Sequence, residues 1–484
     1  MGQAVSVAAL YCCCSAGSSL CNSCCGTVAV GSTGRKRSVL LLAMVIATSL
    51  WFQYDVGPSI IAQQGWVYKV MRFIPYLGSS IQEAWLGDEE GNGCQQYYKE
   101  EDSNEAEGSM KLVEQCAGNA GVFRPTCIST FYFLGNAVAT KVVPTLNREA
   151  WPAKYALFAF ALLISVFIPN GPLFTSVYLW IARLGALCFV VLQQIILIDV
   201  AYNWNEDWVE RATESDRLSF GSGSNWLHAI VGICVTLYTT CLVCVGVMYA
   251  HYTGDGGGGC AGNTWVITLT LLGVIAITVL QLCGTEGSLL TSGVISLYAM
   301  YLCFSIVSKN PNGDCNPELG KNDVWGITIG LLLTTVSLIW TGWSWSAVPR
   351  LSTTETVSSA KAVLPDNNSS SGAAELNLDV PLVDGEEATT TGMVSSSSSA
   401  QTESSSLTHV WKLNIVLALI SCYVAMILTG WGTVDGMDDT NHNAANPTIG
   451  RVNMAILGVA QWMALGLYGW TLLAPTLFPD RDFS

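Results

Sequence analysis

The sequence predicts an all-α membrane protein with about ten transmembrane helices, and its composition is the first observation that supports this fold class. Of the 484 residues, 51% are hydrophobic and only 12% are charged, and the mean hydropathy is +0.41. Soluble domains typically contain about 25% charged residues. The composition therefore excludes an ordinary soluble enzyme.

The second observation is a series of apolar segments of about 20 residues that carry almost no charge. A helix of this length crosses a hydrocarbon core about 30 Å thick and makes its backbone hydrogen bonds internally. An eleventh candidate is the stretch 4–30, which has no charged residue. The ten predicted spans are residues 38–56, 121–143, 151–168, 172–201, 224–250, 263–283, 288–307, 324–348, 410–431 and 449–475.

The net charge of −15 belongs almost entirely to two segments between the spans. Glu83–Glu114 contains ten acidic residues and two lysines, and Arg350–His409 contains eight acidic and two basic residues. The helical body is thus close to neutral and has no basic face for phosphates. Nucleic acid is not expected as a partner.

Basic residues in the short connections predict the orientation, because cytosolic loops are enriched in lysine and arginine. They precede the first span, separate the second from the third, and follow the fourth: Arg35, Lys36, Arg37, Lys141, Arg148, Lys154, Arg211 and Arg217. By alternation, the acidic loop 57–120 faces the exterior or lumen. The C-terminus and the Ser-rich loop 349–408 face the cytosol. That loop is poor in large apolar residues and is expected to be disordered, as a tether or as a regulated binding loop.

The chain then divides into four parts: 1–37, 38–348 with spans 1 to 8, the loop 349–408, and 409–484 with spans 9 and 10. The first part begins with the pattern for myristoylation of Gly2. Nearby cysteines are candidate palmitoylation sites, because one myristoyl chain anchors only marginally. Two alternatives stay open, an eleventh helix and zinc binding through Cys21 and Cys24. The expected acylation sites are Gly2, Cys12, Cys13 and Cys14.

Four further cysteines fall in predicted exterior loops, where oxidation is permitted. They are Cys94, Cys116, Cys260 and Cys315. They allow two disulfides, in three connectivities between which the sequence does not decide.

Residues 172–214 are predicted to form one unusually long helix. Some 40 residues make a rod of about 60 Å, twice the hydrocarbon thickness, so the helix must cross obliquely, extend into the cytosol, or both. Helical spacing places Asp199, Asn203 and Glu206 on one face.

Polar side chains inside spans are costly and are therefore default functional hypotheses. The long helix contains Arg183, Gln193, Gln194 and Asp199. Arg183 and Asp199 are about 24 Å apart along the helix, so each needs another helix, a lipid head group or water. Asp199 either ties two helices together or lines a lipid or ion path. Arg183, Asp199, Asn203 and Glu206 are the candidate site residues.

Two more arginines, Arg124 and Arg451, lie near span ends and are expected to reach water by snorkelling. The chain has no phosphate-binding loop, zinc-protease helix, serine-hydrolase elbow or similar catalytic motif. Its four histidines are scattered. No catalysis, cofactor or metal site is expected.

Motifs distributed from one end of the chain to the other are similar to those of a known protein family. They are the Met1-Gly2 start with its Cys-rich segment, Ile198–Glu210, Val294–Leu302, Cys315-Asn316-Pro317, and Gly469–Pro475 with Arg481-Asp482-Phe483. In these motifs the chain resembles the Serinc (serine incorporator) family of eukaryotic membrane proteins. The resemblance implies ten or so helices in two bundles joined by a long diagonal helix, which residues 172–214 match.

The resemblance also implies a role in membrane lipids, either incorporation of serine into phosphatidylserine and sphingolipids or phospholipid scrambling between leaflets. The favoured hypothesis is a non-enzymatic lipid-handling protein in an endomembrane or the plasma membrane, with membrane phospholipids as its partners. One alternative is a secondary transporter of serine or another small polar solute. The other is a scaffold for lipid-synthesis enzymes.

Overall fold

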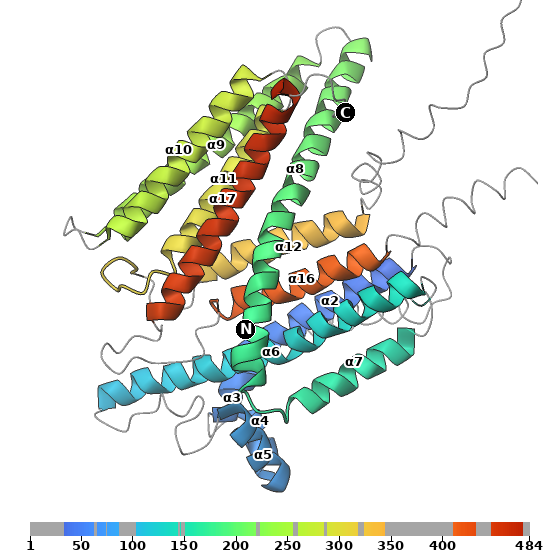
Figure 1. Cartoon of the computed structure of the whole chain (residues 1–484), viewed down its shortest axis with the longest axis vertical. Helices are drawn as coiled ribbons and strands as arrows, with labels where there is room; N and C mark the ends of the chain where they lie inside the picture. The colour runs from blue at the N-terminus through green and yellow to red at the C-terminus, as the bar shows by residue number, and fades with distance from the viewer. Residues whose placement is uncertain are drawn as a thin grey trace, which may run out of the picture.

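The computed structural model consists of two helical bundles crossed by one long helix (Figure 1). Every regular element in its described residues is a helix, so the predicted all-α membrane class and the two-bundle architecture are confirmed. The described residues are 33–61, 65–73, 75–86, 103–143, 146, 151–218, 223–254, 260–284, 288–317, 324–343, 410–431 and 447–477. The predicted acylation sites Gly2, Cys12, Cys13 and Cys14, together with Cys94 and the loop 349–408, lie outside them.

The first bundle is built around α16, which packs along α6 and is buried over most of its length. Hydroxyls join these two helices: Ser129 Oγ and Ser421 Oγ lie 2.7 Å apart. Small and hydroxyl residues are typical of contacts between membrane helices, because they let backbones approach closely. The bundle contains α2 (Thr33–Trp51), α6 (Ser103–Val142), α7 (Trp151–Ser165), α12 (Val324–Trp343) and α16 (Val410–Leu428).

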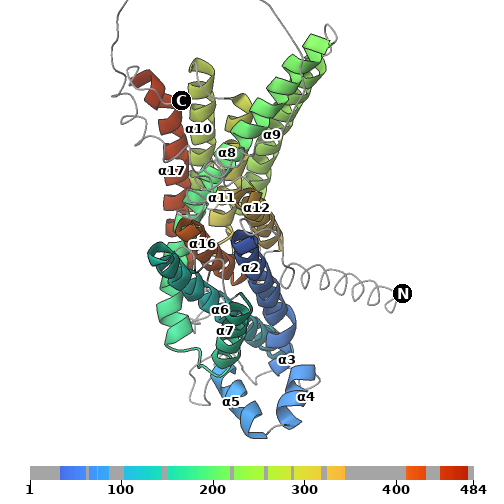
Figure 2. The same ribbon diagram turned by 90° about the vertical axis from the view of Figure 1, so that its right-hand side faces the viewer.

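Three short helices lie at one end of this bundle (Figure 2). The chain continues from α2 through a π-helical turn, η1 (Phe52–Val56), into the first of them. The contact between α3 and α6 requires glycine, because a Cβ on Gly57 would lie 2.6 Å from the Cα of Gly118. The short helices are α3 (Gly57–Ile61), α4 (Trp66–Phe73) and α5 (Pro75–Leu86).

The second bundle surrounds α11 (Leu289–Val307), most of whose residues are buried. Polar side chains cross-link its helices. Gln461 Nε2 donates to Thr270 Oγ1 at 2.8 Å and to the carbonyl of Ala299 at 3.2 Å. The other members are α9 (Ser224–Tyr252), α10 (Ala261–Cys283) and α17 (Pro447–Leu477).

The long helix α8 (Leu179–Leu218) follows a π-helical segment, η4 (Leu173–Tyr178), and contacts both bundles. Its 40 residues make a rod of about 60 Å. Near its start, α8 meets α16 at Gly185, where a Cβ would lie 2.6 Å from Cys422 Sγ. Further along, Tyr298 of α11 donates to the carbonyl of Val190 at 3.0 Å. This helix is therefore the contact surface shared by the two bundles.

Each predicted span coincides with a helix, and seven helices among the described residues are long and apolar enough to cross a membrane. Helices α7 and α12 are apolar but shorter in their described parts. The segment 57–120, which is expected to face the exterior or lumen, contains three short helices, and α6 begins within it at Ser103. Apolar runs of about 20 residues do not predict the start of α6, which is polar, or α3, α4 and α5, which are short.

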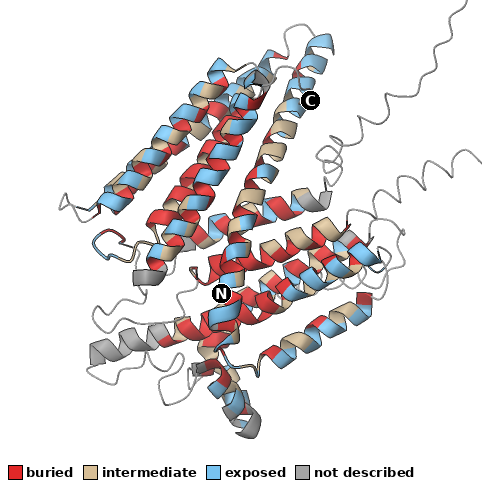
Figure 3. Ribbon diagram, in the orientation of Figure 1, coloured by how far each residue is buried: buried red, intermediate tan, exposed pale blue. Residues whose placement is uncertain are grey.

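The outward faces of the second bundle are apolar. Leu242 of α9 and Leu282 of α10 are 65% and 68% exposed, and both helices show exposed residues along their outer sides (Figure 3). Water-exposed apolar patches of this extent are rare in soluble proteins. These faces are therefore the ones that contact lipid.

Arg124 does not snorkel, contrary to the expectation from its position near a span end. It is fully buried, and all five of its N–H donors have acceptors. Four acceptors are the carbonyls of Ala84, Ala120, Ser165 and Ile168, and the fifth is Asn170 Oδ1. The guanidinium also lies 4.2 Å from the ring centroid of Trp85. Arg451, in contrast, is exposed as expected.

Candidate functional site

The first polar group on α8 is Arg183, at the point where α8 passes the end of α16 and the start of α17. Its side chain is 3% exposed. Nη2 donates to the carbonyl of Trp431 at 3.4 Å, which is longer than an ordinary hydrogen bond. Asn453 Nδ2 of α17 donates to the same carbonyl at 2.9 Å. Trp431 presents this carbonyl from a left-handed backbone conformation, with φ of +70°, just after α16.

The Arg183 cation is incompletely satisfied. Its Nε atom is buried without a hydrogen-bond partner, as is Oδ1 of the neighbouring Asn453. Within the described part of the chain the guanidinium has no carboxylate partner, and it lies over the Trp180 ring, 5.2 Å from the ring centroid. A buried cation without a counter-ion is destabilising, so an anionic group that reached it would be held strongly.

The second polar group is the pair Gln193 and Gln194, halfway along the part of α8 between the bundles. Gln193 Oε1 accepts a hydrogen bond from Tyr298 at 3.3 Å, but its Nε2 has no partner. Neither amide atom of Gln194 has a partner, although the residue is 1% exposed. Leaving a buried amide unpaired costs about 1–3 kcal/mol per group.

The third polar group is Asp199 with Asn203, one turn further along. Asp199 is half-buried. Its Oδ2 accepts from the indole Nε1 of Trp340 on α12 at 2.8 Å, and its Oδ1 accepts from Asn203 Nδ2 at 3.1 Å. The carboxylate therefore links α8 to α12. Glu206 is exposed and lies beyond this link.

The four candidate residues thus do not form one compact site. Asp199 and Asn203 are in contact, Arg183 lies about 24 Å away along the helix, and Glu206 faces outward. Trp431 and Trp340 provide the contacts of Arg183 and Asp199, and neither tryptophan was predicted from the sequence. Tryptophan near a span end is an ordinary interfacial residue, so no local signal could have singled them out.

Of the four cysteines predicted in exterior loops, two are joined in a disulfide, Cys260–Cys315, with their Cα atoms 5.4 Å apart. Cys116 is buried and is also disulfide-bonded. Among the described residues, no group of three or more His, Cys, Asp or Glu side chains could hold a metal ion.

Comparison with known proteins decides the family. The model of the serine incorporator (Serinc) family matches residues 10–481. The chain belongs to the Serinc family. It is 28% identical to a probable serine incorporator of Nematostella vectensis over 78% of this chain and 81% of that protein. It is 26% identical to serine incorporator 3 of Bos taurus, over 74% and 78%. With its apolar helices, membership in Serinc makes it an integral multi-pass membrane protein.

Proposed function

We propose that this Serinc chain is a non-enzymatic lipid-handling protein that lets phospholipid head groups pass between leaflets along α8. The observation that carries the proposal is the set of polar groups on this helix, among which Arg183, Gln193 and Gln194 are buried with unpaired atoms. Arg183, Gln193 with Gln194, and Asp199 lie at three successive heights. Arg183 and the two glutamines have polar atoms free to bond a head group, and the half-buried carboxylate of Asp199 can accept further hydrogen bonds beyond those from Trp340 and Asn203.

The polar side chains of α8 can offset the cost of moving a head group through the membrane. A charged head group is expensive to move through hydrocarbon, and polar side chains lower that cost by replacing its water. Arg183 suits the phosphate, and the carboxylate of Asp199 suits an ammonium or hydroxyl. The two lie about 24 Å apart along α8 and on nearly opposite faces of it, so a head group would have to pass around the helix to meet both while its acyl chains stayed in lipid.

A further support is the position of these groups where the bundles meet. Arg183 is held between α8, α16 and α17, and Gln193 contacts α11. At 3.6 residues per turn, Arg183 and Gln194 lie on the same face of α8 and Asp199 on nearly the opposite face, so a small separation of the bundles would expose Arg183 and Gln194 along one line. The proposal therefore includes a conformational change at this junction.

The test is reconstitution of the purified full chain in liposomes. Fluorescent phosphatidylserine in the inner leaflet becomes accessible to dithionite if lipids cross, and radiolabelled serine uptake is measured in parallel. Lipid crossing without serine uptake is the expected result. Serine uptake without lipid crossing would establish a transporter instead, and neither activity would favour a scaffold for lipid-synthesis enzymes.

A pair of glutamine variants makes the test specific to α8. Gln194→Leu removes an unpaired buried amide, so we expect the free energy of unfolding to rise by about 1 kcal/mol while lipid crossing falls. The control is Gln281→Leu in α10, where Oε1 accepts from Ser292 at 3.2 Å and from Tyr468 at 3.4 Å. This variant should lose stability and keep lipid crossing. The opposite pattern would remove α8 from the path.

A further inference from the structure

Two cavities follow one another along the contact between α9 and α10, away from the polar groups of α8. The first, of about 510 Å³, lies where α9 ends and α10 begins; its lining includes Tyr249, Thr253, Thr264, Trp265 and Thr268. The second, of about 220 Å³, lies deeper along the same two helices. Its lining includes Val245, Val274, Ile275 and Val279. A hydroxyl-lined mouth thus opens next to an apolar slot.

The hydrogen bonds of the mouth leave mainly acceptors facing the cavity. The hydroxyls of Thr253, Thr264 and Thr268 donate to the carbonyls of Tyr249, Cys260 and Thr264, at 2.6, 3.3 and 2.6 Å. Tyr249 OH lies 2.7 Å from Thr268 Oγ1. Since the Thr268 hydrogen is already used, Tyr249 is the donor in that pair. Each hydroxyl hydrogen is thus already used in a hydrogen bond, and the remaining oxygen lone pairs can accept hydrogen bonds from a ligand with donor groups.

The two cavities together extend from one end of α10 to beyond the depth of a single leaflet. On α10, Thr264 and Thr268 lie about 4–10 Å from the first residue, Ala261, and Ile275 and Val279 lie about 21–27 Å from it. One leaflet contributes about 15 Å of hydrocarbon. With the mouth at the membrane interface, the slot therefore begins near the bilayer midplane and continues beyond it, so a chain bound there must extend through the whole depth of its leaflet. Ile275 and Val279 are 50% and 52% exposed, so the slot opens toward lipid.

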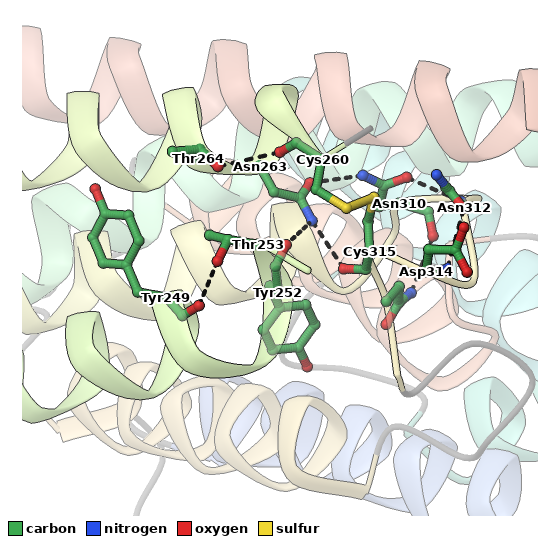
Figure 4. Close-up of a disulfide and its surroundings, with 11 residues drawn as sticks. Tyr249, Tyr252, Thr253, Cys260, Asn263, Thr264, Asn310, Asn312, Asp314 and Cys315 are labelled. Carbon is green, nitrogen blue, oxygen red and sulfur yellow. Dashed lines mark hydrogen bonds between the residues drawn. A yellow bond between two sulfur atoms is a disulfide. The ribbon is translucent and has the colours of Figure 1, made fainter. Parts of the chain in front are cut away.

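A disulfide and one asparagine hold the mouth in place (Figure 4). The Cys260–Cys315 bond ties the start of α10 to the segment after α11. Asn263 Nδ2 donates to the carbonyls of Tyr252 and Cys315 at 2.9 and 3.0 Å. Because disulfides persist in oxidising compartments, this end of the helices faces the lumen or exterior, as the basic residues of the loops predict.

We propose that the α9–α10 groove binds a lipid with a ceramide backbone. One hydrocarbon chain fills the apolar slot, and the amide N–H and the backbone hydroxyl donate to the threonine oxygens of the mouth. The first turn of α10 supplies backbone N–H groups, which suit the amide carbonyl. The site is separate from the polar groups of α8 and requires only that α9 and α10 face the bilayer.

The chemistry of the mouth favours this ligand over other membrane lipids. Glycerophospholipids carry two esters at the same depth, which accept but do not donate hydrogen bonds. An ammonium head group would be better served by a carboxylate, and the residues lining the mouth include none. A sterol brings one hydroxyl and no amide.

The experiment uses the purified full chain in phosphatidylcholine nanodiscs with a photoactivatable, alkyne-bearing ceramide. Crosslinked peptides are identified by mass spectrometry, with unlabelled sphingomyelin or extra phosphatidylcholine as competitor. These two share a head group and differ at the interface, so the comparison isolates the amide and hydroxyl. Labelling is expected within 238–253 and 261–279. Sphingomyelin should lower the labelling about fivefold more than phosphatidylcholine, which is the change in affinity expected for one hydrogen bond.

Matched variants test each half of the groove. Thr264→Val should lower labelling about fivefold, whereas Thr236→Val, which removes an exposed hydroxyl with a similar bond to its own helix, should not. Ile275→Trp should block the slot, and Leu272→Trp, at a similarly exposed position outside the slot, should leave labelling intact. Equal competition by phosphatidylcholine, competition by cholesterol alone, or labelling outside the groove would each overturn the proposal. Lipid crossing in liposomes is a separate readout, so loss of one activity does not decide the other.

Discussion

Among the residues that the structure describes, Arg124 and Arg183 are almost completely buried, and their surroundings are opposite. Arg124, in the first bundle, uses all five donors on carbonyl and amide oxygens and stacks on Trp85. Arg183, at the junction with the second bundle, makes one long hydrogen bond to Trp431 and leaves Nε unpaired. One cation has all its donors hydrogen-bonded within the fold, and the other keeps a buried donor without an acceptor.

This difference in hydrogen bonding indicates how structural and functional polar residues can be distinguished in a membrane protein. Burial alone does not separate them, since both side chains are at most 3% exposed. Hydrogen-bond satisfaction separates them, because the protein loses stability when a fully bonded group is removed and does not when an unbonded group is removed. The same contrast applies to Gln281, which is bonded, and Gln194, which is not.

The largest expected effect is on Arg124. Arg124→Leu removes five hydrogen bonds from a charged donor and leaves the carbonyl of Ile168 and Oδ1 of Asn170 without that donor, so the free energy of unfolding should fall by at least about 3 kcal/mol. Thermal unfolding of the purified protein measures this, with Arg451→Leu as the exposed control. Unchanged stability in Arg124→Leu would erase the contrast between the two arginines.

A smaller loss is expected at the link between α8 and α12. Trp340→Phe removes the donor to Asp199 Oδ2, and hydrogen bonds to charged groups contribute about 1.5–3 kcal/mol. Asp199→Asn keeps an acceptor oxygen and should retain most of that stability. If Asp199→Asn also keeps full lipid crossing, Asp199 is only an interhelical tie, which would shorten the proposed path to Arg183 and the glutamines.

The stability effect at Arg183 is expected to be smaller again. Arg183→Met removes one long hydrogen bond but also removes an uncompensated buried charge. The free energy of unfolding should therefore change by less than about 1 kcal/mol in either direction. Thermal unfolding alongside Arg124→Leu gives the comparison directly. A loss as large as that of Arg124→Leu would make Arg183 a structural residue.

The smallest effect is expected at Glu206, which is exposed beyond the link between α8 and α12. Glu206→Gln should change the free energy of unfolding by no more than about 0.5 kcal/mol and should not affect lipid crossing. A marked loss of crossing would extend the functional part of α8 beyond the membrane.

Local patterns in the sequence predicted much of the fold and part of the site. Apolar runs placed the helices, and helical spacing brought Asp199 next to Asn203. The contact of Asp199 with Trp340 joins residues 141 positions apart, which no local pattern encodes. Arg124 was misjudged for the same reason: distance from a span end says nothing about the carbonyls of α5 and the 165–170 segment that surround it.

The most direct test of the account is the rate of lipid crossing by Arg183→Met in liposomes that contain the same amount of folded protein as the wild type. Dithionite quenching of fluorescent phosphatidylserine gives the rate for both. If Arg183 meets the phosphate of a passing head group, the rate should fall about tenfold or more, as expected when a charged hydrogen bond is lost, while stability is maintained. An unchanged rate in a normally folded variant would contradict the claim that the unsatisfied cation serves lipid movement.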